Sequence, residues 1–553
     1  MHILTLHEDT NANITLFKDT QVLFSIAEER LSRVKYQGGF PVKSLHLALD
    51  KYGLSLNDIE LIICGNKYHF LPRILWDKFP SYTHSFLGTA QKISVYYQHA
   101  LFKNKVLRNS VEAFNKFMLK HKFNKPVALT EHHTAHAYSA YLTSGFDKAL
   151  TITTDNFGDG LSSAVFACEN SRCKFLYGSS ALQSPGQFYG EIAQALGFHP
   201  LLAGKMTGLA GYGNPLVAYD LMKTLFSLTA DRKGFKLPAL IYKSPNRGIY
   251  RKLRVYKKED IAAAAQRRFE EVMLDYVLAA IKNTGASSVA LAGGVFGNVR
   301  LNQKISELKE VREIFIHPGM SDQGISLGVG LKYLAENLGL KPFKLKDVYW
   351  GPEYNNQQIQ EELKKTKLEY KYLDNIEIAI AKLLSTGKTV ARFNGRMEYG
   401  PRALGNRSIL YQTSDPKVND WLNKKLHRAE FMPFAPVTLE EYAKKCYQNT
   451  EKVKDNLKFM TISVYCTEWM KKISPAVVHI DGTARPQILS QDDNFGYYKV
   501  LEEYYRITGI PSLINTSFNM HEEPIVSSPN DAIRAFKAAD LDYLAIGNYL
   551  VTQ

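Results

Sequence analysis

Residues 149–160 read ALTITTDNFGDG and carry the clearest local signal in the first half of the chain. The run 149–154 is rich in apolar and β-branched residues, which is typical of a buried strand. Asp155 follows directly, and a glycine-rich turn extends to residue 160. A carboxylate at the carboxyl end of a strand faces the ligand crevice of an open α/β sheet. The stretch therefore predicts a strand that brings Asp155 to a binding site.

Two histidines lie upstream of this strand, in the sequence EHHTAHAYSAY at residues 131–141. The apolar spacing of the segment predicts a helix, and residues four apart share one face of a helix. His132 and His136 can therefore each offer one nitrogen to a common ion, whereas His133 points elsewhere. A histidine pair alone is more often structural than metal-binding, so the prediction depends on carboxylates that could join it.

A second candidate carboxylate, Asp322, lies in HPGMSDQG at residues 317–324, just before a glycine and a predicted helix. Two histidines with one or two aspartates form a nitrogen and oxygen donor set that suits Fe(II), Mn(II) or Zn(II). Such a set is unlike the thiolate set of a structural zinc site. The first half of the chain therefore predicts a divalent metal site.

Strand and helix patterns alternate along the chain, which indicates an α/β protein. The first half is predicted to contain strands at 3–6, 14–17, 22–27, 61–64, 127–129, 149–154, 289–292 and 314–316, and helices at 42–52, 261–283 and 325–338. The second half is predicted to contain helices at 376–385, 418–425, 498–506 and 531–538, and strands at 390–393, 459–464, 512–514 and 543–546. The pattern weakens between residues 338 and 350, and no internal sequence repeat is evident. We therefore expect two domains, residues 1–344 and 345–553.

The composition of the 553 residues is that of a soluble globular protein, with 45% hydrophobic and 22% charged residues. Lys and Arg number 69 against 54 Asp and Glu, so the formal net charge is +15. This balance favours an anionic partner, which could be nucleic acid, phosphate or a membrane surface. Residues 232–258 hold ten Lys and Arg and no acidic residue. This segment is interpreted as a solvated insertion, with an anion-attracting edge of a site as the alternative.

The five cysteines, at positions 64, 168, 173, 446 and 466, include no CxxC pair and are too few for a disulfide framework. We expect them to be small buried residues in a reducing compartment. No uncharged apolar stretch approaches the roughly 18 residues needed to span a bilayer. Glu8 and Asp9 lie too close to the start for a signal peptide. We therefore expect a cytoplasmic protein.

Glycine-rich turns recur in the first half, at 155–160, 292–302 and 321–330. Glycines let the backbone approach phosphate, and helix N-termini favour anions. Together with the nearby carboxylates these turns suggest a nucleotide crevice. The segment GKMTGLAGYGN at 204–214 adds a lysine between glycines. The candidate nucleotide-binding residues are Gly158, Lys205, Gly208, Gly293, Gly294 and Asn298.

The second half carries a dense arginine motif, FNGRMEYGPRALGNRSIL at residues 393–410. Guanidinium groups bind oxyanions through two parallel hydrogen bonds, so three arginines within twelve residues predict a phosphate or carboxylate site. Pairing with surface carboxylates is the alternative, but only Glu398 lies among them. The candidate ligands here and downstream are Arg396, Arg402, Asn406, Arg407, Ser408, Lys424, Arg428, Arg485, Asn515, Ser517 and Asn519.

These motifs, together with FMPFAPV, HIDGTARPQ and INTSFNMHEEPIV, occur in the order seen in the NodU/CmcH family of O-carbamoyltransferases, which the chain resembles as far as about residue 525. The resemblance implies an N-terminal domain of the actin/Hsp70/sugar-kinase (ASKHA) fold, in the variant of the tRNA threonylcarbamoyladenosine synthases. It implies a YrdC-like C-terminal domain. It also implies an Fe(II)-type metal held by four ligands, which are His132, His136, Asp155 and Asp322.

The resemblance implies a two-step activity. Carbamoyl phosphate and ATP, with Mg²⁺, would give carbamoyl adenylate in the C-terminal domain, and the N-terminal domain would transfer the carbamoyl group to a hydroxyl. The residues implied at the transfer site are His7, Glu8, Asp9 and Lys35. Relatives have a His-Asp pair where this chain reads Glu8-Asp9, so either His7 or Glu8 would be the base. Met432 stands where many relatives have arginine.

The expected partner is a small hydroxylated molecule, such as a secondary metabolite or a sugar, and not a membrane or a nucleic acid. Whether the chain forms a homodimer is left open. One alternative is tRNA modification of the threonylcarbamoyl type, which the positive charge would suit. A second is a nucleotide-regulated binding protein without transfer chemistry. A third is a sugar kinase, which would release ADP and not AMP.

Overall fold

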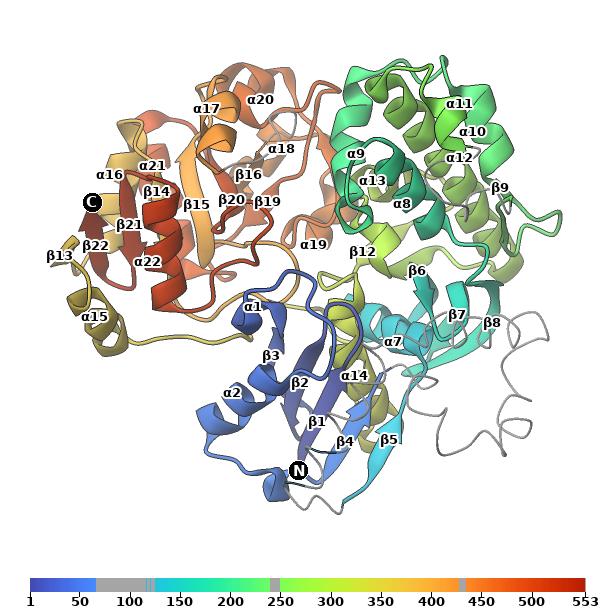
Figure 1. The fold of residues 1–553 in the computed structure, drawn as a ribbon, viewed down its shortest axis with the longest axis horizontal. Coiled ribbons are helices and arrows are strands. Elements are labelled where there is room, and N and C mark those ends of the chain that lie inside the picture. The colour runs from blue at the N-terminus through green and yellow to red at the C-terminus, as the bar shows by residue number, and fades with distance from the viewer. Residues whose placement is uncertain (66–115, 117–119, 121–124, 239–248, 427–433, 553) are drawn as a thin grey trace. The chain divides into compact units, whose positions relative to one another are not determined.

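The computed structural model describes residues 1–65, 116, 120, 125–238, 249–426 and 434–552 (Figure 1). The chain divides into two compact units. The N-terminal unit contains Met1–Glu28 and Tyr36–Leu345, and the C-terminal unit contains Glu29–Lys35 and Lys346–Gln553. Residues 29–35, which include the short helix α1 (Glu29–Ser32), therefore belong to the second unit, although a single division at 344/345 places them in the first. Both units combine sheets and helices, so the predicted α/β class is confirmed.

The N-terminal unit contains two five-stranded sheets with the same topology. The first has the order β3-β2-β1-β4-β5 and the second, read from its other edge, β8-β7-β6-β11-β12. In each sheet the first three strands are antiparallel and the last two join parallel to the central strand. This doubled sheet is of the ASKHA type that the resemblance implied. The strands are β1 (His2–His7), β2 (Asn13–Lys18), β3 (Gln21–Ala27), β4 (Leu61–Cys64), β5 (Val127–Leu129), β6 (Lys148–Gly158), β7 (Leu161–Glu169), β8 (Arg172–Ser180), β11 (Ser288–Ala292) and β12 (Glu313–Ile316).

The remaining described elements of this unit are helices and one small hairpin. They are α2 (Val42–Tyr52), α7 (His132–Ser144), α8 (Pro185–Ala195), α9 (Gly204–Leu209), α10 (Tyr219–Leu225), α11 (Ile249–Leu253), α12 (Lys258–Thr284), α13 (Val299–Ser306) and α14 (Ile325–Leu338), with β9 (Ser227–Leu228) pairing β10 (Phe235–Lys236). Part of the basic segment 232–258, residues 239–248, lies outside the described residues. Among the described residues, no helix is both long and apolar enough to cross a membrane.

Helices α7 and α14 pack against each other, and α14 also packs on β1 and β2 (Figure 1). Two glycines of α14 allow this close approach. A Cβ on Gly328 would lie 1.9 Å from the carbonyl oxygen of Ala135 on α7, and one on Gly330 would lie 2.1 Å from the ring of Phe17 on β2. The glycines therefore fix how closely α14 meets the elements that flank it.

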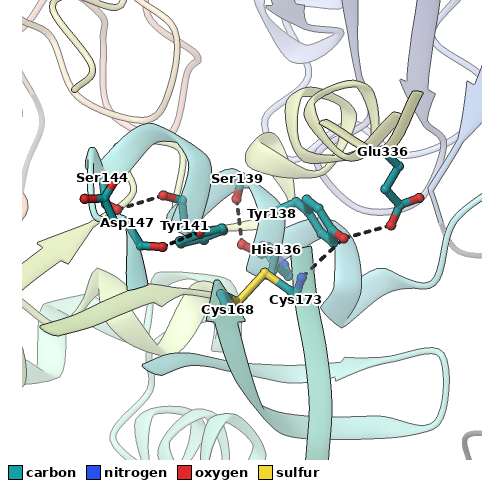
Figure 2. Close-up of a disulfide and its surroundings, with 9 residues drawn as sticks. All are labelled: His136, Tyr138, Ser139, Tyr141, Ser144, Asp147, Cys168, Cys173 and Glu336. Atoms are coloured by element: carbon teal, nitrogen blue, oxygen red, sulfur yellow. Dashed lines mark hydrogen bonds between the residues drawn. A yellow bond between two sulfur atoms is a disulfide. The ribbon is translucent and has the colours of Figure 1, made fainter. Parts of the chain in front are cut away.

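A disulfide joins Cys168 and Cys173 across the hairpin of β7 and β8 (Figure 2). The expectation that all five cysteines are unpaired is therefore wrong for these two. Asn170 and Ser171 both have positive φ, so the hairpin turns tightly and the two cysteines become direct cross-strand partners. The other three cysteines are free and buried, as expected.

The C-terminal unit is built on an eight-stranded sheet of order β13-β22-β21-β14-β15-β20-β16-β19. Its strands are β13 (Glu369–Tyr372), β14 (Val390–Phe393), β15 (Arg407–Gln412), β16 (Ala435–Leu439), β19 (Gln487–Leu489), β20 (Ser512–Ser517), β21 (Tyr543–Ile546) and β22 (Tyr549–Thr552), and β17 (Val464–Tyr465) pairs separately with β18 (Thr483–Ala484). Its helices are α15 (Asn356–Lys364), α16 (Ile376–Ser385), α17 (Val418–Lys425), α18 (Ala443–Cys446), α19 (Lys454–Leu457), α20 (Glu468–Ile473), α21 (Phe495–Thr508) and α22 (Pro529–Ala538). The predicted strand 459–464 is wrong apart from its last residue.

Apolar residues of α16 and α21 form one core with those of β14, β15, β16 and β20. Strand β15 includes Arg407 and Ser408, so the arginine motif is not a single loop. Its last part forms a strand in the interior of the sheet, between β14 and β20.

The close contact between α7 and α14 predicts that alanine at Gly328 lowers the stability of the protein, whereas alanine at a helical glycine with free space around it does not. Gly328→Ala should lower the free energy of unfolding by about 1–3 kcal/mol, because the new Cβ meets backbone that must move. Gly204→Ala, in α9, should be neutral or slightly stabilising, since nothing lies within 4 Å of its Cβ position and alanine favours helix. Denaturant unfolding of both variants measures this. Equal effects of the two substitutions would contradict the close packing.

Candidate metal centre

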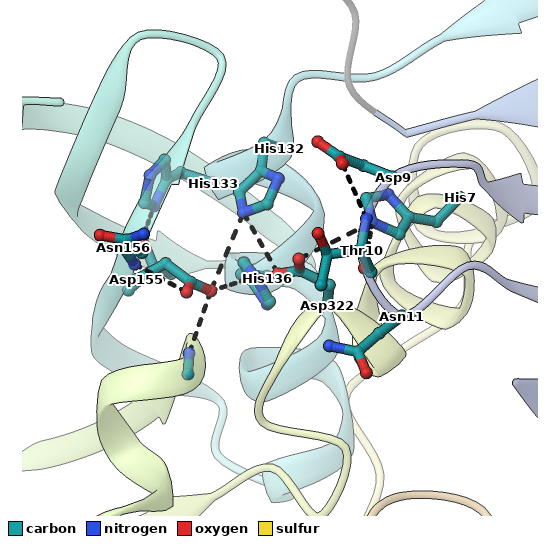
Figure 3. Close-up of polar contacts among 12 residues, drawn as sticks. His7, Asp9, Thr10, Asn11, His132, His133, His136, Asp155, Asn156 and Asp322 are labelled. Carbon is teal, nitrogen blue, oxygen red and sulfur yellow. Dashed lines mark hydrogen bonds and ion pairs between the residues drawn. The ribbon is translucent and has the colours of Figure 1, made fainter. Parts of the chain in front are cut away.

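Four side chains from distant parts of the sequence meet in the N-terminal unit (Figure 3). They are His132 and His136 of α7, Asp155 of β6 and Asp322 at the turn before α14. One ligand atom from each lies within 4.8 Å of the others. The sequence-predicted pair and both carboxylates are thus brought together.

The four histidine-to-carboxylate distances within the group fit a single ion. His136 Nε2 lies 3.4 Å from Asp155 Oδ2 and 3.7 Å from Asp322 Oδ1. His132 Nε2 lies 4.0 and 3.8 Å from the same two atoms. Donors bound at about 2.0–2.2 Å can be no more than about 4.4 Å apart, so all four distances are within reach of one ion. Nε2 of His136 is buried and makes no hydrogen bond, as expected of a nitrogen reserved for a ligand.

The first turn of α7 is held by two acidic side chains. Glu131 caps the helix and accepts hydrogen bonds from the backbone N–H groups of His133 and Thr134, at 2.9 and 2.6 Å. Asp159 Oδ2 accepts from the N–H of His132 at 2.8 Å. These bonds fix the helix start, so His132 and His136 project from one face. Asp159 was not identified from the sequence.

Gly158 and Gly294 act through close approach to the candidate ligands. A Cβ on Gly158 would lie 2.2 Å from the ring of His132, so only glycine leaves room for this histidine. The N–H of Gly294 donates to Asp155 Oδ2 at 3.0 Å. Gly293, with φ of 101°, has no room for a Cβ because Thr154 O lies 2.1 Å from that position. The glycines predicted to cradle a nucleotide thus contact or adjoin the carboxylate site.

The charges of the four groups are strongly coupled. Burial, and then the nearby Asp155 carboxylate, raise the pKa of Asp322 to about 8. Burial opposes ionisation of Asp155, but His132 and His136 outweigh it and hold its pKa well below the usual value. Burial would lower the pKa of His136, yet the two carboxylates raise it to about 9. Positive charge is therefore required between the carboxylates, which a divalent cation would supply in place of a proton.

The carboxyl end of β1 lies beside this group. His7 is fully buried, with its Nε2 3.8 Å from Asp322 Oδ2 and 3.2 Å from the carbonyl oxygen of Thr10. Asp9 accepts from the N–H of Thr10 and is drawn beside His7 in Figure 3. Glu8 is buried, and burial followed by repulsion from Asp9 raises the pKa of its carboxyl well above the usual value. Lys35 belongs to the other compact unit.

Two other buried histidines adjoin the group. His133 contacts Thr153 Oγ1 at 2.8 Å and the carbonyl oxygen of Leu161 at 3.2 Å, which agrees with its predicted orientation away from the ion. His317 contacts Thr143 Oγ1 at 3.0 Å, and burial, then the proximity of His136, lower its pKa to about 3. No role for His317 is predicted from the sequence.

The other candidate nucleotide residues of this unit lie on helices. Asn298 caps α13 and contacts Gln266 of α12 at 3.0 Å. Lys205 and Gly208 lie within α9 and not in a turn.

In the C-terminal unit, two of the predicted phosphate-binding arginines contact backbone carbonyl groups. Arg407 is fully buried and donates to the carbonyl oxygens of residues 352, 394, 395 and 406. Arg396 donates to the carbonyl oxygen of Trp350 at 2.8 Å and to that of Gly351 at 3.4 Å. The phosphate-binding prediction did not anticipate these structural bonds, because the sequence does not show which carbonyls lack other donors.

Glu398 organises the same stretch. Its Oε1 accepts from the N–H groups of Leu404, Asn406 and Arg407 at 2.8, 2.8 and 3.1 Å. The side chain of Asn406 bonds to the carbonyl oxygen of Arg396 and to Arg392, and Ser408 Oγ accepts from the N–H of Gly405. Buried Arg392, which is not among the residues predicted from the sequence, also donates to the carbonyl oxygen of Gly405. The acidic residue among the arginines thus shapes the loop.

Arg402 and Arg485 are neighbours of like charge. Burial, followed by the charge of Arg402, holds the pKa of Arg485 well below its usual value. The Nε of Arg485 is buried without a hydrogen-bond partner. Two adjacent guanidinium groups of this kind form an attractive site for an anion.

The remaining candidates differ in surroundings. Asn515 is buried and donates to the carbonyl oxygen of Ala403 and to Gln487, while Ser517 bonds to Asn519 at 2.6 Å. Lys424 is exposed on α17, and Arg428 lies outside the described residues.

Two family models match this chain. The model described as Carbamoyltransferase N-terminus matches residues 2–331, and the one described as Carbamoyltransferase C-terminus matches residues 381–553.

Individual relatives cover most of the chain. Nodulation protein NolNO of Sinorhizobium fredii is 31% identical, over 97% of this chain and 78% of that protein. An uncharacterized protein of Methanocaldococcus jannaschii is 32% identical, over 100% and 99%. Nodulation protein U of Sinorhizobium fredii is 27% identical, over 70% and 72%.

Solved structures also show similarity. HypF of T. kodakarensis has a TM-score of 0.38 and 13% identity, over 61% of this chain and 48% of that chain. Component A of the Acidaminococcus fermentans (R)-2-hydroxyglutaryl-CoA dehydratase has a TM-score of 0.35 and 13% identity, over 60% and 96%.

The geometry predicts that the chain binds one divalent ion through these four side chains. Titration of the metal-free protein with Fe(II), Mn(II) or Zn(II) should show one site, and His136→Ala or Asp155→Asn should weaken it by at least about 100-fold. His46→Ala, an exposed histidine on α2, is the control and should not change the affinity. Unaltered binding in both site variants would exclude this cluster as the metal centre.

Gly158→Ala tests the packing around the metal centre. The added Cβ would overlap the ring of His132 and displace its nitrogen, so the metal affinity should fall by about 10–100-fold. Gly297→Ala, where nothing lies within 4 Å, is the matched control. A Gly158→Ala protein with the wild-type affinity would show that the position of His132 does not depend on this glycine.

Proposed function

The chain belongs to the carbamoyltransferase family, and on that premise we propose that it is an ATP-dependent O-carbamoyltransferase with a small hydroxylated acceptor. The observation that carries the proposal is the convergence of His132, His136, Asp155 and Asp322 in a chain that both family models match. We assign carbamoyl activation to the C-terminal unit, as a YrdC-like domain, and carbamoyl transfer to the N-terminal unit.

In the activation step, water hydrolyses carbamoyl phosphate to carbamate and phosphate. A carbamate oxygen then attacks the α-phosphorus of ATP, the bond to the β-phosphate breaks, and carbamoyl adenylate and diphosphate form. Negative charge on the phosphoryl oxygens requires fixed donors. The guanidinium groups of Arg402 and Arg485 support this assignment, because burial and then the charge of Arg402 lower the pKa of Arg485, and the Nε of Arg485 is buried without a hydrogen-bond partner.

In the transfer step, the acceptor hydroxyl attacks the carbamoyl carbon, the bond to AMP breaks, and the hydroxyl proton passes to a base. A bound divalent ion, which we propose to be Fe(II) or a similar metal, would supply Lewis-acid polarisation of an oxygen. His7 lies beside the site, with Nε2 3.8 Å from Asp322 Oδ2, and we assign the proton transfer to its imidazole; the Nε2 contact with the carbonyl oxygen of Thr10 must open before that nitrogen can accept a proton. Burial and repulsion from Asp9 raise the pKa of the Glu8 carboxyl and so favour its protonated form, and for this reason we assign the proton transfer to His7 and not to Glu8.

The activation step predicts formation of diphosphate from ATP and Mg²⁺ only when carbamoyl phosphate is present. Arg402→Met should lower this rate by about 100-fold or more, because one charge-stabilising donor is lost. Arg506→Met, an exposed arginine on α21, should leave the rate unchanged. Release of ADP in place of AMP would support a kinase, and absence of diphosphate would overturn the proposal.

The same division of labour can be tested with His136→Ala. This variant should still form diphosphate but should not carbamoylate any acceptor, which mass spectrometry of an acceptor pool would detect as a carbamoyl mass gain. Loss of both reactions in a folded protein would contradict separate sites. Co-purified tRNA that gains mass would point to the tRNA-modifying alternative.

A further inference from the structure

Residues 29–35 connect β3 with the segment leading to α2, and both of these belong to the N-terminal unit, yet the seven residues cluster with the C-terminal unit. Two arginines dominate the contacts of this segment. Arg30 is 4% exposed, and the side chain of Arg33, which adopts a φ of 62°, is half-buried, with 23% of its surface exposed. A buried guanidinium group requires hydrogen-bond or charged partners, so the contacts of these two arginines show what the segment does in this unit.

Arg30 forms a hydrogen bond to the backbone in the middle of the arginine motif. Its Nη2 donates to the carbonyl oxygen of Gly400 at 3.0 Å, and its Nε lies 3.5 Å from Glu29. Gly400 has a φ of 89° and precedes Arg402 by two residues. The bonds of Arg396 and Glu398 hold the flanking parts of this loop. The contact from Arg30 is made at the turn between them.

Arg33 forms hydrogen bonds to the backbone of a second stretch of the same unit, at residues 524–525. It donates to the carbonyl oxygens of Ile525 and Pro524 at 2.8 and 2.6 Å. It also donates to the carbonyl oxygen of Arg30 at 3.3 Å. Ile525 packs in a small apolar cluster with Met397 and Ala403 of the arginine motif. The segment thus joins the loop that carries Arg402 to the stretch that follows residues 515–519.

We propose that Arg30 is a positioning residue of the anion site: it fixes the turn at Gly400 and thereby the guanidinium of Arg402 beside Arg485. This inference rests on the proposed function only in naming the anion as the phosphoryl part of a substrate. Arg30 acts through the backbone and touches no reacting atom. Because the oxyanion must meet donors already in place, a loosened turn would weaken anion binding.

Calorimetric titration of the full-length protein with inorganic diphosphate tests the proposal without requiring turnover. Arg30→Met, which keeps most of the side-chain length but removes the donors, should weaken diphosphate binding by at least about 10-fold. Arg30→Lys should weaken it less, since one charged donor remains. Arg506→Met is the matched control and should bind as the wild type does.

A double-mutant cycle separates positioning from a general loss of stability. If Arg30 acts through Arg402, adding Arg30→Met to Arg402→Met should weaken diphosphate binding no further. Metal affinity of the N-terminal unit should be unchanged in Arg30→Met. Wild-type affinity of Arg30→Met, or strictly additive effects, would overturn the proposal. Should Arg30→Met not fold, Arg30→Lys decides: weaker binding supports the role and unchanged binding overturns it.

The experiments distinguish failure of the proposed carbamoyltransferase function from failure of the proposed role of Arg30. A wild-type protein that binds diphosphate, but releases none from ATP with carbamoyl phosphate, would overturn the proposed function and leave the role of Arg30 to the titration. A wild-type protein that binds no diphosphate would overturn the anion site and with it the role of Arg30.

Discussion

Two largely buried carboxylates that share a small volume repel each other unless positive charge lies between them. Asp155 and Asp322 are in this position, and each affects the ionisation of the other and of His136. The two residues are about 170 positions apart in the sequence. Asp155 lies in strand β6 and Asp322 at the turn before α14, and the fold of the doubled sheet brings the two side chains together. The fold of the N-terminal unit therefore creates a site where two carboxylates need a positive charge, and a bound divalent cation would supply it.

Glycines make the metal centre sterically possible. Gly158 gives room to His132, Gly293 lets its turn approach Thr154, and Gly328 lets α14 approach α7. Each position is occupied by the one residue without a Cβ, and each close contact involves backbone or a histidine ring that cannot easily move. Glycine-rich turns were interpreted as phosphate cradles, but several of these glycines instead serve the approach of protein groups to one another.

The arginine motif illustrates a limit of sequence reasoning. Arg396, Arg402 and Arg407 look alike in the sequence, yet Arg407 is buried against carbonyl groups while Arg402 neighbours Arg485. The division depends on β15, which begins at Arg407 and draws that side chain into the interior. Glu398, taken as an isolated acid, accepts three backbone N–H groups and shapes the loop.

The sequence alone was sufficient for the α/β class, for many element bounds such as Val42–Tyr52 and Ile325–Leu338, and for the identity of the four clustered donors. The class and the element bounds rest on local periodicity, and the four donors rest on residue types together with the family resemblance of their motifs; the order of residues contains both directly. Only the tertiary structure decided which arginines are structural, that Cys168 pairs with Cys173, and that residues 29–35 belong to the C-terminal unit. Each of these depends on contacts between groups whose partners are set by chain packing, and no local pattern records which carbonyl, thiol or loop will be within reach.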